Sequence, residues 1–174
     1  RCINAQVDGI LACFELEATD VNLIAAPLTH GASCFVLPIL AVGGRHVLLE
    51  EPKPTNVLRA IDAHGVTTIY APPTLIYGML GEVRTDDGRR FPTLRHVIYS
   101  AAPMRGEQIR EAQRVFGPVI ETAFGQVEAP QIITAMRAAE LERDENVASV
   151  GRASPVATVG IMGPDGSLLA NGEV

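Results

Sequence analysis

Short runs of apolar and β-branched residues alternate along the chain with longer segments whose apolar residues recur at helical spacing. Runs without interleaved polar positions are typical of strands that are covered on both faces of a sheet. They predict five strands, at residues 22–26, 46–49, 67–71, 96–100 and 119–122. The segments between them predict four helices, at 33–42, 56–64, 73–80 and 106–116. The alternation indicates βαβ units and a doubly wound, mostly parallel α/β sheet.

Local signals support parts of this assignment. Pro54 and Thr55 precede the second predicted helix and Gly65 follows it, which matches capping preferences at both ends. The fourth helix has one apolar face, formed by Ile109, Ala112, Val115 and Phe116. Residues 85–91 predict a solvated loop, and residues 137–145 predict an exposed charged helix.

The C-terminal segment has a different pattern. From residue 157 onward, alternating apolar residues surround Pro164, Asp165 and Gly166, which are strong turn formers. We therefore predict a C-terminal β-hairpin. The chain divides into an α/β subdomain at 1–155 and a hairpin at 156–174 that begins the next subdomain.

The composition narrows the class of ligand. The chain has 174 residues, and 47% of them are hydrophobic, which is enough to form one hydrophobic core. Its net charge is −6. No Lys/Arg cluster is present to neutralise phosphates, so a small-molecule ligand is favoured over nucleic acid. Three irregularly spaced cysteines favour a cytoplasmic protein over a disulfide framework. No apolar stretch reaches the roughly 18 residues of a membrane helix. An oligomer is compatible with the sequence.

Three segments rich in small residues follow predicted strands, at residues 26–33 (APLTHGAS), 99–104 (YSAAPM) and 122–128 (TAFGQVE). Ligand sites of parallel α/β sheets lie beyond the carboxyl ends of the strands, and small residues let a ligand approach the backbone. The three segments are therefore the candidate site.

In this order and at these separations, the segments resemble the AMP-forming acyl-CoA synthetases of the adenylate-forming, AMP-binding enzyme superfamily. PLTHG is similar to the family's histidine motif, SAAP to its adenine-facing segment, and FGQVE to its aromatic-Gly-x-Thr-Glu signature. SVGRASP and the residues after it resemble the family's later Gly-Arg segment and hairpin. The resemblance implies an enzyme that joins a carboxylic acid to ATP and then transfers the acyl group from AMP to coenzyme A.

The resemblance implies a nucleotide site. Phe124 would stack on one face of adenine, and the backbone of Ala101, Ala102 and Pro103 would cover the other face. Thr122 would lie near the exocyclic amine, and Gly125 would leave room for the phosphate.

It also implies a catalytic pair. Glu128 would hold Mg²⁺ against the phosphates, a task suited to a carboxylate oxygen, and His30 would lie beside the reacting acid. The acyl pocket would include His30, Ala101 and Gly125.

Two residues depart from the family pattern. Val127 stands where the family has a threonine that contacts the AMP phosphate, and Ala101 stands where glycine is common. The family's phosphate loop and its C-terminal lid domain with a catalytic lysine do not match any segment of this chain. We therefore expect an internal fragment of the large N-terminal domain that is inactive alone.

Three alternatives stay open. Val127 favours a non-catalytic protein that binds a nucleotide or acyl ligand on a degenerate adenylating fold. Luciferases and peptide-synthetase adenylation domains share these motifs, so the acceptor can differ from coenzyme A. Taken singly, His30, Phe124 and Glu128 are also compatible with an unrelated flavodoxin-like module.

Overall fold

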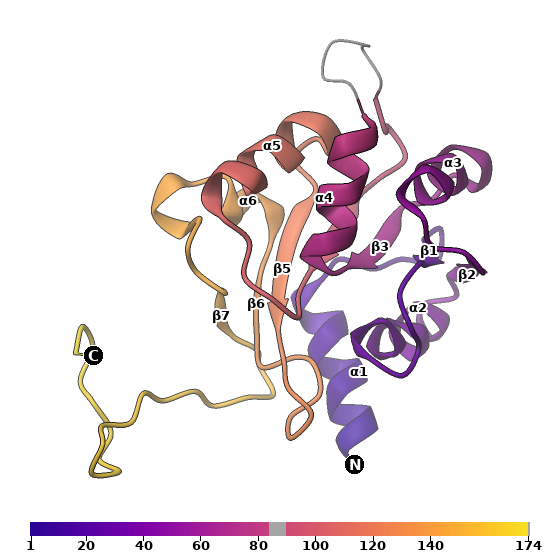
Figure 1. Ribbon diagram of the computed structural model, residues 1–174. Helices are drawn as coiled ribbons and strands as arrows, with labels where there is room; N and C mark the ends of the chain where they lie inside the picture. The colour runs from indigo at the N-terminus through magenta and orange to yellow at the C-terminus, as the bar shows by residue number, and fades with distance from the viewer. Residues whose placement is uncertain (84–89, 174) are drawn as a thin grey trace.

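A single mixed sheet organises the chain. The computed structural model describes residues 1–83 and 90–173 (Figure 1). Its seven strands lie in the order β2-β1-β3-β4-β5-β6-β7. β1 to β5 are parallel, and β6 and β7 continue the sheet antiparallel. The strands are β1 (Val21–Ile24), β2 (Arg45–Leu48), β3 (Thr68–Ala71), β4 (His96–Tyr99), β5 (Ile120–Phe124), β6 (Thr134–Met136) and β7 (Arg152–Ala153). The predicted mostly parallel α/β fold is confirmed.

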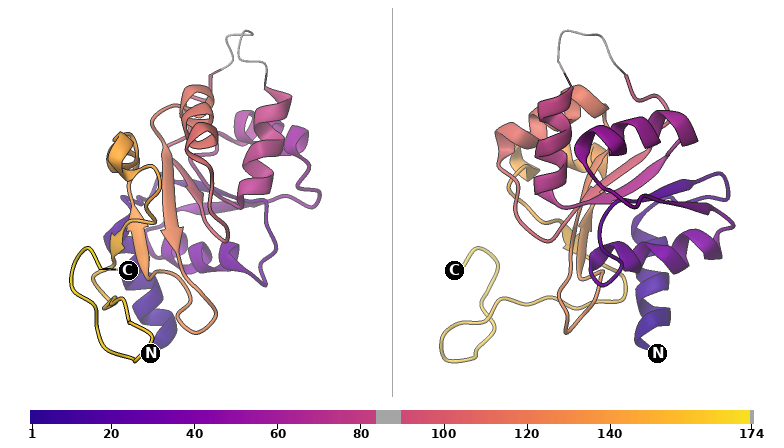
Figure 2. Two further views of the ribbon diagram at one scale, coloured as in Figure 1. Left: turned by 60° about the vertical axis from the view of Figure 1, so that its left-hand side comes forward. Right: turned by 45° about the vertical axis from the view of Figure 1, so that its right-hand side comes forward.

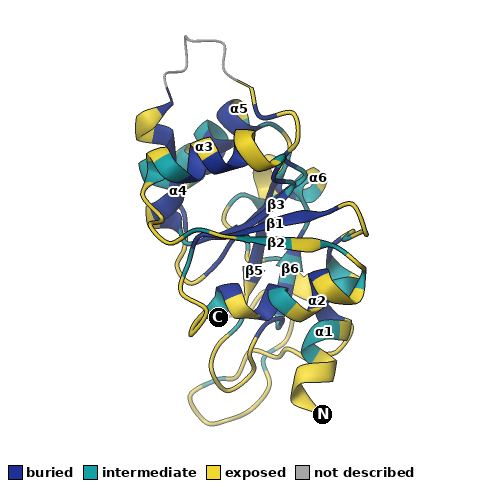
Figure 3. Ribbon diagram, turned by 90° about the vertical axis from the view of Figure 1, so that its right-hand side faces the viewer, coloured by how far each residue is buried: buried dark blue, intermediate teal, exposed yellow. Residues whose placement is uncertain are grey.

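Helices cover both faces of the sheet (Figure 3). One face packs against α3 (Pro54–His64), α4 (Pro73–Glu82), α5 (Gly106–Phe116) and the short α6 (Ala138–Leu141), and this layer holds the larger hydrophobic core. The other face packs against α1 (Cys2–Cys13), the 3-10 helix η1 (Gly31–Phe35) and α2 (Val36–Ala41) around a smaller core. The described helices include none long and apolar enough to cross a bilayer.

The order of the parallel strands places the ligand region. After β1 the chain moves outward to β2, and it then returns past β1 to β3, β4 and β5. Neighbouring loops at such a reversal diverge to opposite faces of the sheet and leave a crevice beyond the carboxyl ends of the strands. Here that crevice lies between β1 and β3.

The local signals predicted these elements well. Each of the five strands and four helices forms within two residues of its predicted bounds. Gly65 ends α3 in the left-handed conformation that only glycine adopts freely, with φ 60°. The predicted helix at 33–42 is divided, because η1 forms its first turn and α2 its remainder.

Other expectations need correction. The exposed helix predicted at 137–145 is reduced to α6 and a 3-10 turn (Asp144–Asn146), and it is not fully exposed because Leu141 is buried in the larger core. Residues 85–89 of the predicted solvated loop lie outside the described residues. Phe91, at the end of that segment, is buried against Phe116 with ring centroids 5.2 Å apart.

The predicted C-terminal hairpin is present only in a reduced form. A turn joins Met162 and Leu168 in one antiparallel bridge, and the backbone N–H of Leu169 donates to the carbonyl of Ile161. This segment extends away from the sheet in Figure 1 and in the right-hand view of Figure 2. The proposed division at residue 155 stays a prediction.

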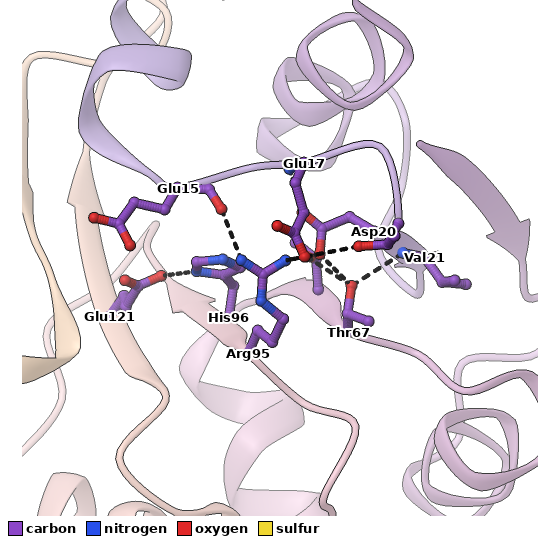
Figure 4. Close-up of polar contacts among 10 residues, drawn as sticks. Glu15, Glu17, Asp20, Val21, Thr67, Arg95, His96 and Glu121 are labelled. Carbon is purple, nitrogen blue, oxygen red and sulfur yellow. Dashed lines mark hydrogen bonds and ion pairs between the residues drawn. The ribbon is translucent and has the colours of Figure 1, made fainter. Parts of the chain in front are cut away.

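A buried carboxylate joins the amino ends of three parallel strands (Figure 4). Asp20, with 0% of its surface exposed, directly precedes β1. Its Oδ1 accepts hydrogen bonds from Thr67 Oγ1 at 2.6 Å and Arg95 Nη1 at 2.8 Å, one residue before β3 and β4. Its Oδ2 accepts a bond from the backbone N–H of Glu17 at 2.8 Å. The carboxylate is therefore fully used as an acceptor, and it fixes the relative positions of the strands.

We predict that Asp20→Ala lowers the free energy of unfolding of the chain by about 3 kcal/mol, because it leaves the Thr67 and Arg95 donors without their buried acceptor. Glu17→Gln is the matched control, since Glu17 also pairs with Arg95, at 2.7 Å, but its side chain is 55% exposed. An exposed pair contributes less than about 1 kcal/mol. Urea unfolding measures the free energy of unfolding of both variants. An equal loss of stability in the two variants would contradict the anchoring role of Asp20.

Candidate functional site

Two cavities lie at the carboxyl ends of the parallel strands. The first cavity has a volume of about 300 Å³ and is lined by residues 99–104, 122–125 and 147–150. The second cavity has a volume of about 540 Å³ and lies at the reversal between β1 and β3, where residues 26–27 and 29–31 and Pro72 line it. Both are lined by Ser100, Ala101 and Gly125, so they meet at these residues.

The first cavity brings together four of the residues predicted for adenine. Ala102 and Pro103 line it from the loop after β4, and Thr122 and Phe124 line it from β5. Phe124 is 40% exposed, so part of its ring is open to a ligand. Thr122 is buried. Burial raises the pKa of the Tyr99 phenol, and its hydrogen bond with Thr122 lowers it by a smaller amount.

The second cavity contains His30. Its Nδ1 lies 2.9 Å from Thr29 Oγ1, a contact that restricts the orientation of the ring at the exposed rim. Gly31, the next residue, packs on the Tyr70 phenol, and a Cβ there would lie 2.2 Å from the hydroxyl oxygen. Only glycine therefore allows the loop to approach the floor of this cavity so closely.

Ala101 and Gly125 form the junction between the cavities. Ala101 has a φ of 74°, the only positive φ among the non-glycine residues that the structure describes. This conformation costs an alanine roughly 1 kcal/mol. Gly125 packs on the far end of its own loop, because a Cβ would lie 2.8 Å from the backbone nitrogen of Gln131. The predicted reason for Gly125 was room for a phosphate, and the structure supplies close packing as a further reason.

The loop after β5 carries the other two predicted residues. Val127 lines the second cavity at its rim and is 94% exposed. Glu128 is exposed and lines neither cavity. The described residues contain no group of three or more His, Cys, Asp or Glu side chains that could hold a metal ion. A metal at Glu128 would therefore need most of its ligands from phosphate oxygens and water.

The sequence pattern missed several lining residues. Residues 147–150 form a wall of the first cavity, and Cys34, Tyr70 and Gln131 line the second. Tyr70 lies in a strand that the pattern predicts as plain core, and Gln131 lies outside every recognised motif. Residues 147–150 reach the site only because the antiparallel end of the sheet folds back. None of these residues carries a local signal.

The fold and the paired cavities define an α/β domain with a two-part ligand site at the carboxyl ends of its strands. The model of the AMP-binding enzyme family matches residues 2–174, and the chain belongs to that family. The family resemblance seen in the three loop segments is thereby confirmed.

Individual relatives show the breadth of this similarity. The chain is 32% identical over 165 residues to the medium/long-chain-fatty-acid–CoA ligase FadD8 of Mycobacterium tuberculosis, covering 94% of this chain and 28% of that protein. It is 32% identical over 116 residues to a salicylyl-CoA synthase / salicylate adenylyltransferase of Streptomyces, covering 65% of this chain and 21% of that protein.

A solved structure agrees with the fold. The amide bond synthetase McbA of Marinactinospora thermotolerans superposes with a TM-score of 0.89 at 27% identity, covering 99% of this chain and 34% of that one. The chain thus spans about a third or less of the length of each of these relatives.

We predict that Ala101→Gly raises the free energy of unfolding by about 1 kcal/mol, because glycine adopts a positive φ without steric cost. Ala102→Gly is the matched control at the neighbouring position, where φ is not positive, and it should lower stability by about 0.5 kcal/mol. Thermal or urea unfolding measures the sign of the change in the free energy of unfolding for each variant. The same sign for both variants would contradict strain at Ala101.

Proposed function

We propose that the chain is part of an ATP-dependent carboxylic acid:CoA ligase of the AMP-forming type. A carboxylate oxygen attacks the α-phosphorus of ATP, the bond to pyrophosphate breaks, and acyl-AMP forms. The thiol of coenzyme A then attacks the acyl carbon and AMP leaves. The observation that carries this proposal is the junction of the two cavities at Ala101 and Gly125, which brings a nucleotide and an acid within reach of each other.

The first cavity suits the nucleotide. An adenine ring can lie between the Phe124 ring and the backbone at Ala102 and Pro103, since stacking supplies affinity in an open apolar slot. Thr122 lies in the same cavity and supplies a polar edge for the exocyclic amine.

The second cavity suits the acid. His30 lies at the rim of this cavity, which also includes the junction residues Ala101 and Gly125, where the carboxylate would meet the nucleotide phosphate. A ring nitrogen there can donate a hydrogen bond to the carboxylate and hold it in the attacking position. This placement leaves the apolar walls of the cavity for the acyl group.

The exposed carboxylate of Glu128 fits a magnesium ion. Mg²⁺ is commonly held by one or two carboxylates together with substrate phosphates and water, which matches a single carboxylate beside a nucleotide site. When bound, the ion would neutralise phosphate charge that develops as pyrophosphate leaves.

The acid and the acceptor are separate questions. The relatives named above act on fatty acids and on salicylate, and one is an amide bond synthetase. Coenzyme A is the acceptor that we propose, because two of these three names specify it. An amine acceptor is the alternative within the same adenylating chemistry.

The decisive experiment is acid-dependent exchange of pyrophosphate into ATP by the full-length protein that contains this chain. Exchange with at least one carboxylic acid supports adenylation, and acyl-CoA formation on addition of coenzyme A identifies the acceptor. A well-folded protein that shows no pyrophosphate exchange with any acid would contradict the enzyme proposal. Nucleotide binding without exchange would support the second candidate, a non-catalytic binding protein, which the absence of a hydroxyl at Val127 favours.

We predict that Phe124→Ala weakens binding of AMP about 5- to 150-fold, because stacking of a base on an aromatic ring contributes about 1 to 3 kcal/mol. Phe124→Tyr is the control that retains the ring, and it should bind AMP within about threefold of the wild type. Calorimetric titration of AMP into the full-length protein measures both. Unchanged binding by the alanine variant would place adenine elsewhere.

We predict that Val127→Thr raises the exchange rate about tenfold or more, because a hydroxyl aimed at the phosphate adds a donor where negative charge develops. Val127→Ala is the control, since it shortens the same exposed side chain without adding a donor. Initial exchange rates at saturating ATP distinguish the two variants. A comparable gain from alanine would show that the size of the side chain matters rather than the hydroxyl.

A further inference from the structure

The floor of the second cavity is polar although its walls are apolar. Most of the lining residues are exposed or half-buried, and the walls include Ala26, Pro27, Pro72 and Pro130. The buried members of the lining all carry a hydrogen-bonding side chain, and they are Cys34, Tyr70, Ser100 and Gln131. In an apolar cavity, a small number of polar groups commonly determines which ligand is accepted and how it is oriented.

Three of these floor residues form a hydrogen-bonded group. Gln131 Nε2 donates to Ser100 Oγ at 2.9 Å. Burial raises the pKa of the Tyr70 phenol, and its hydrogen bonds with Ser100 and Gln131 lower it by a smaller amount. The Oε1 of Gln131 has no hydrogen-bond partner although the residue is only 5% exposed. An unpartnered buried acceptor is costly, so the group has capacity for one more donor.

The cavity is also closed behind Tyr70. The Tyr70 ring packs on Phe35 with centroids 5.6 Å apart, and Phe35 packs on Phe14 with centroids 5.9 Å apart. Both phenylalanines are fully buried. Gly31 covers the hydroxyl of Tyr70 from the loop side. An alkyl chain that enters the cavity therefore meets a filled aromatic layer at this end.

We infer that the second cavity selects a compact carboxylic acid that carries a hydroxyl or amino substituent, and that Tyr70, Ser100 and Gln131 determine this selection. This inference rests on the proposed function, because it assumes that the second cavity holds the acid. The carboxylate lies towards His30 and the junction, and the substituent lies against the polar floor. A plain hydrocarbon end would face the same floor without satisfying Gln131 Oε1.

The test compares matched acids with the full-length protein. Values of kcat/KM for pyrophosphate exchange are measured with benzoate, the three hydroxybenzoates, the three aminobenzoates, hexanoate and hexadecanoate. At least one substituted benzoate should exceed benzoate about tenfold, the factor expected for one well-placed hydrogen bond. Hexadecanoate should be the poorest of the acids.

Substitutions of two residues in the cavity floor test which side chains determine the selectivity. Tyr70→Phe retains the ring that packs on Phe35 and loses the hydroxyl, and Gln131→Leu removes the amide. Each should reduce the ratio of substituted acid to benzoate about tenfold. Tyr77→Phe is the matched control, because Tyr77 is half-buried on α4 and lines neither cavity, so the ratio should stay that of the wild type.

The outcomes separate this inference from the proposed function. A preference for benzoate or hexadecanoate over every substituted benzoate would overturn the inference and leave the ligase proposal standing. Wild-type selectivity retained in both floor variants would also overturn it. Calorimetric titration of the same acids provides a readout that needs no turnover. Selective binding of a substituted benzoate without exchange would support the inference and refute the ligase activity.

Discussion

The buried carboxylate of Asp20 is the contact on which the geometry of the site depends. It joins the residues that directly precede β1, β3 and β4, so it fixes the strands where they begin. In the sheet, Asn22 pairs with Thr68 and Thr68 pairs with His96, so the three strands start within one residue of the same level. Parallel strands of similar length that start level also end level. The loops that follow β1, β3 and β4 consequently emerge beside one another.

The level ends explain how two cavities meet. The loop after β1 and Pro72 after β3 border the crevice where the strand order reverses, and Ser100 after β4 reaches into it. The loop after β4 then turns through Ala101 with its positive φ, which directs Ala102 and Pro103 to the first cavity instead. One strained residue therefore separates the lining of the two cavities. On its N-terminal side, this loop is fixed by β4, which ends at Tyr99.

Much of the fold could be predicted because its signals are local. Apolar strand runs, the proline that begins α3 and the glycine that follows it act within a few residues of chain. The site loops followed from the same pattern together with the family resemblance of His30, Pro103 and Phe124. α1, β6 and β7 were not predicted. α1 has neither a side-chain cap nor an acidic first turn, and the two short strands are defined by pairing with distant residues.

The polar floor could not be predicted for a related reason. Tyr70, Ser100 and Gln131 come from two strand ends and a loop, and only the packed sheet makes them neighbours. The loop from Gly125 to Gln131 also connects one departure from the family pattern, Val127, to the polar floor. Its exposed side carries Val127, and its buried end carries Gln131, whose backbone packs on Gly125. A structural change at one end of this loop therefore affects the other end through the contact between Gly125 and Gln131. Under the proposed function, this one short segment would therefore position residues on both the nucleotide side and the acid side of the site.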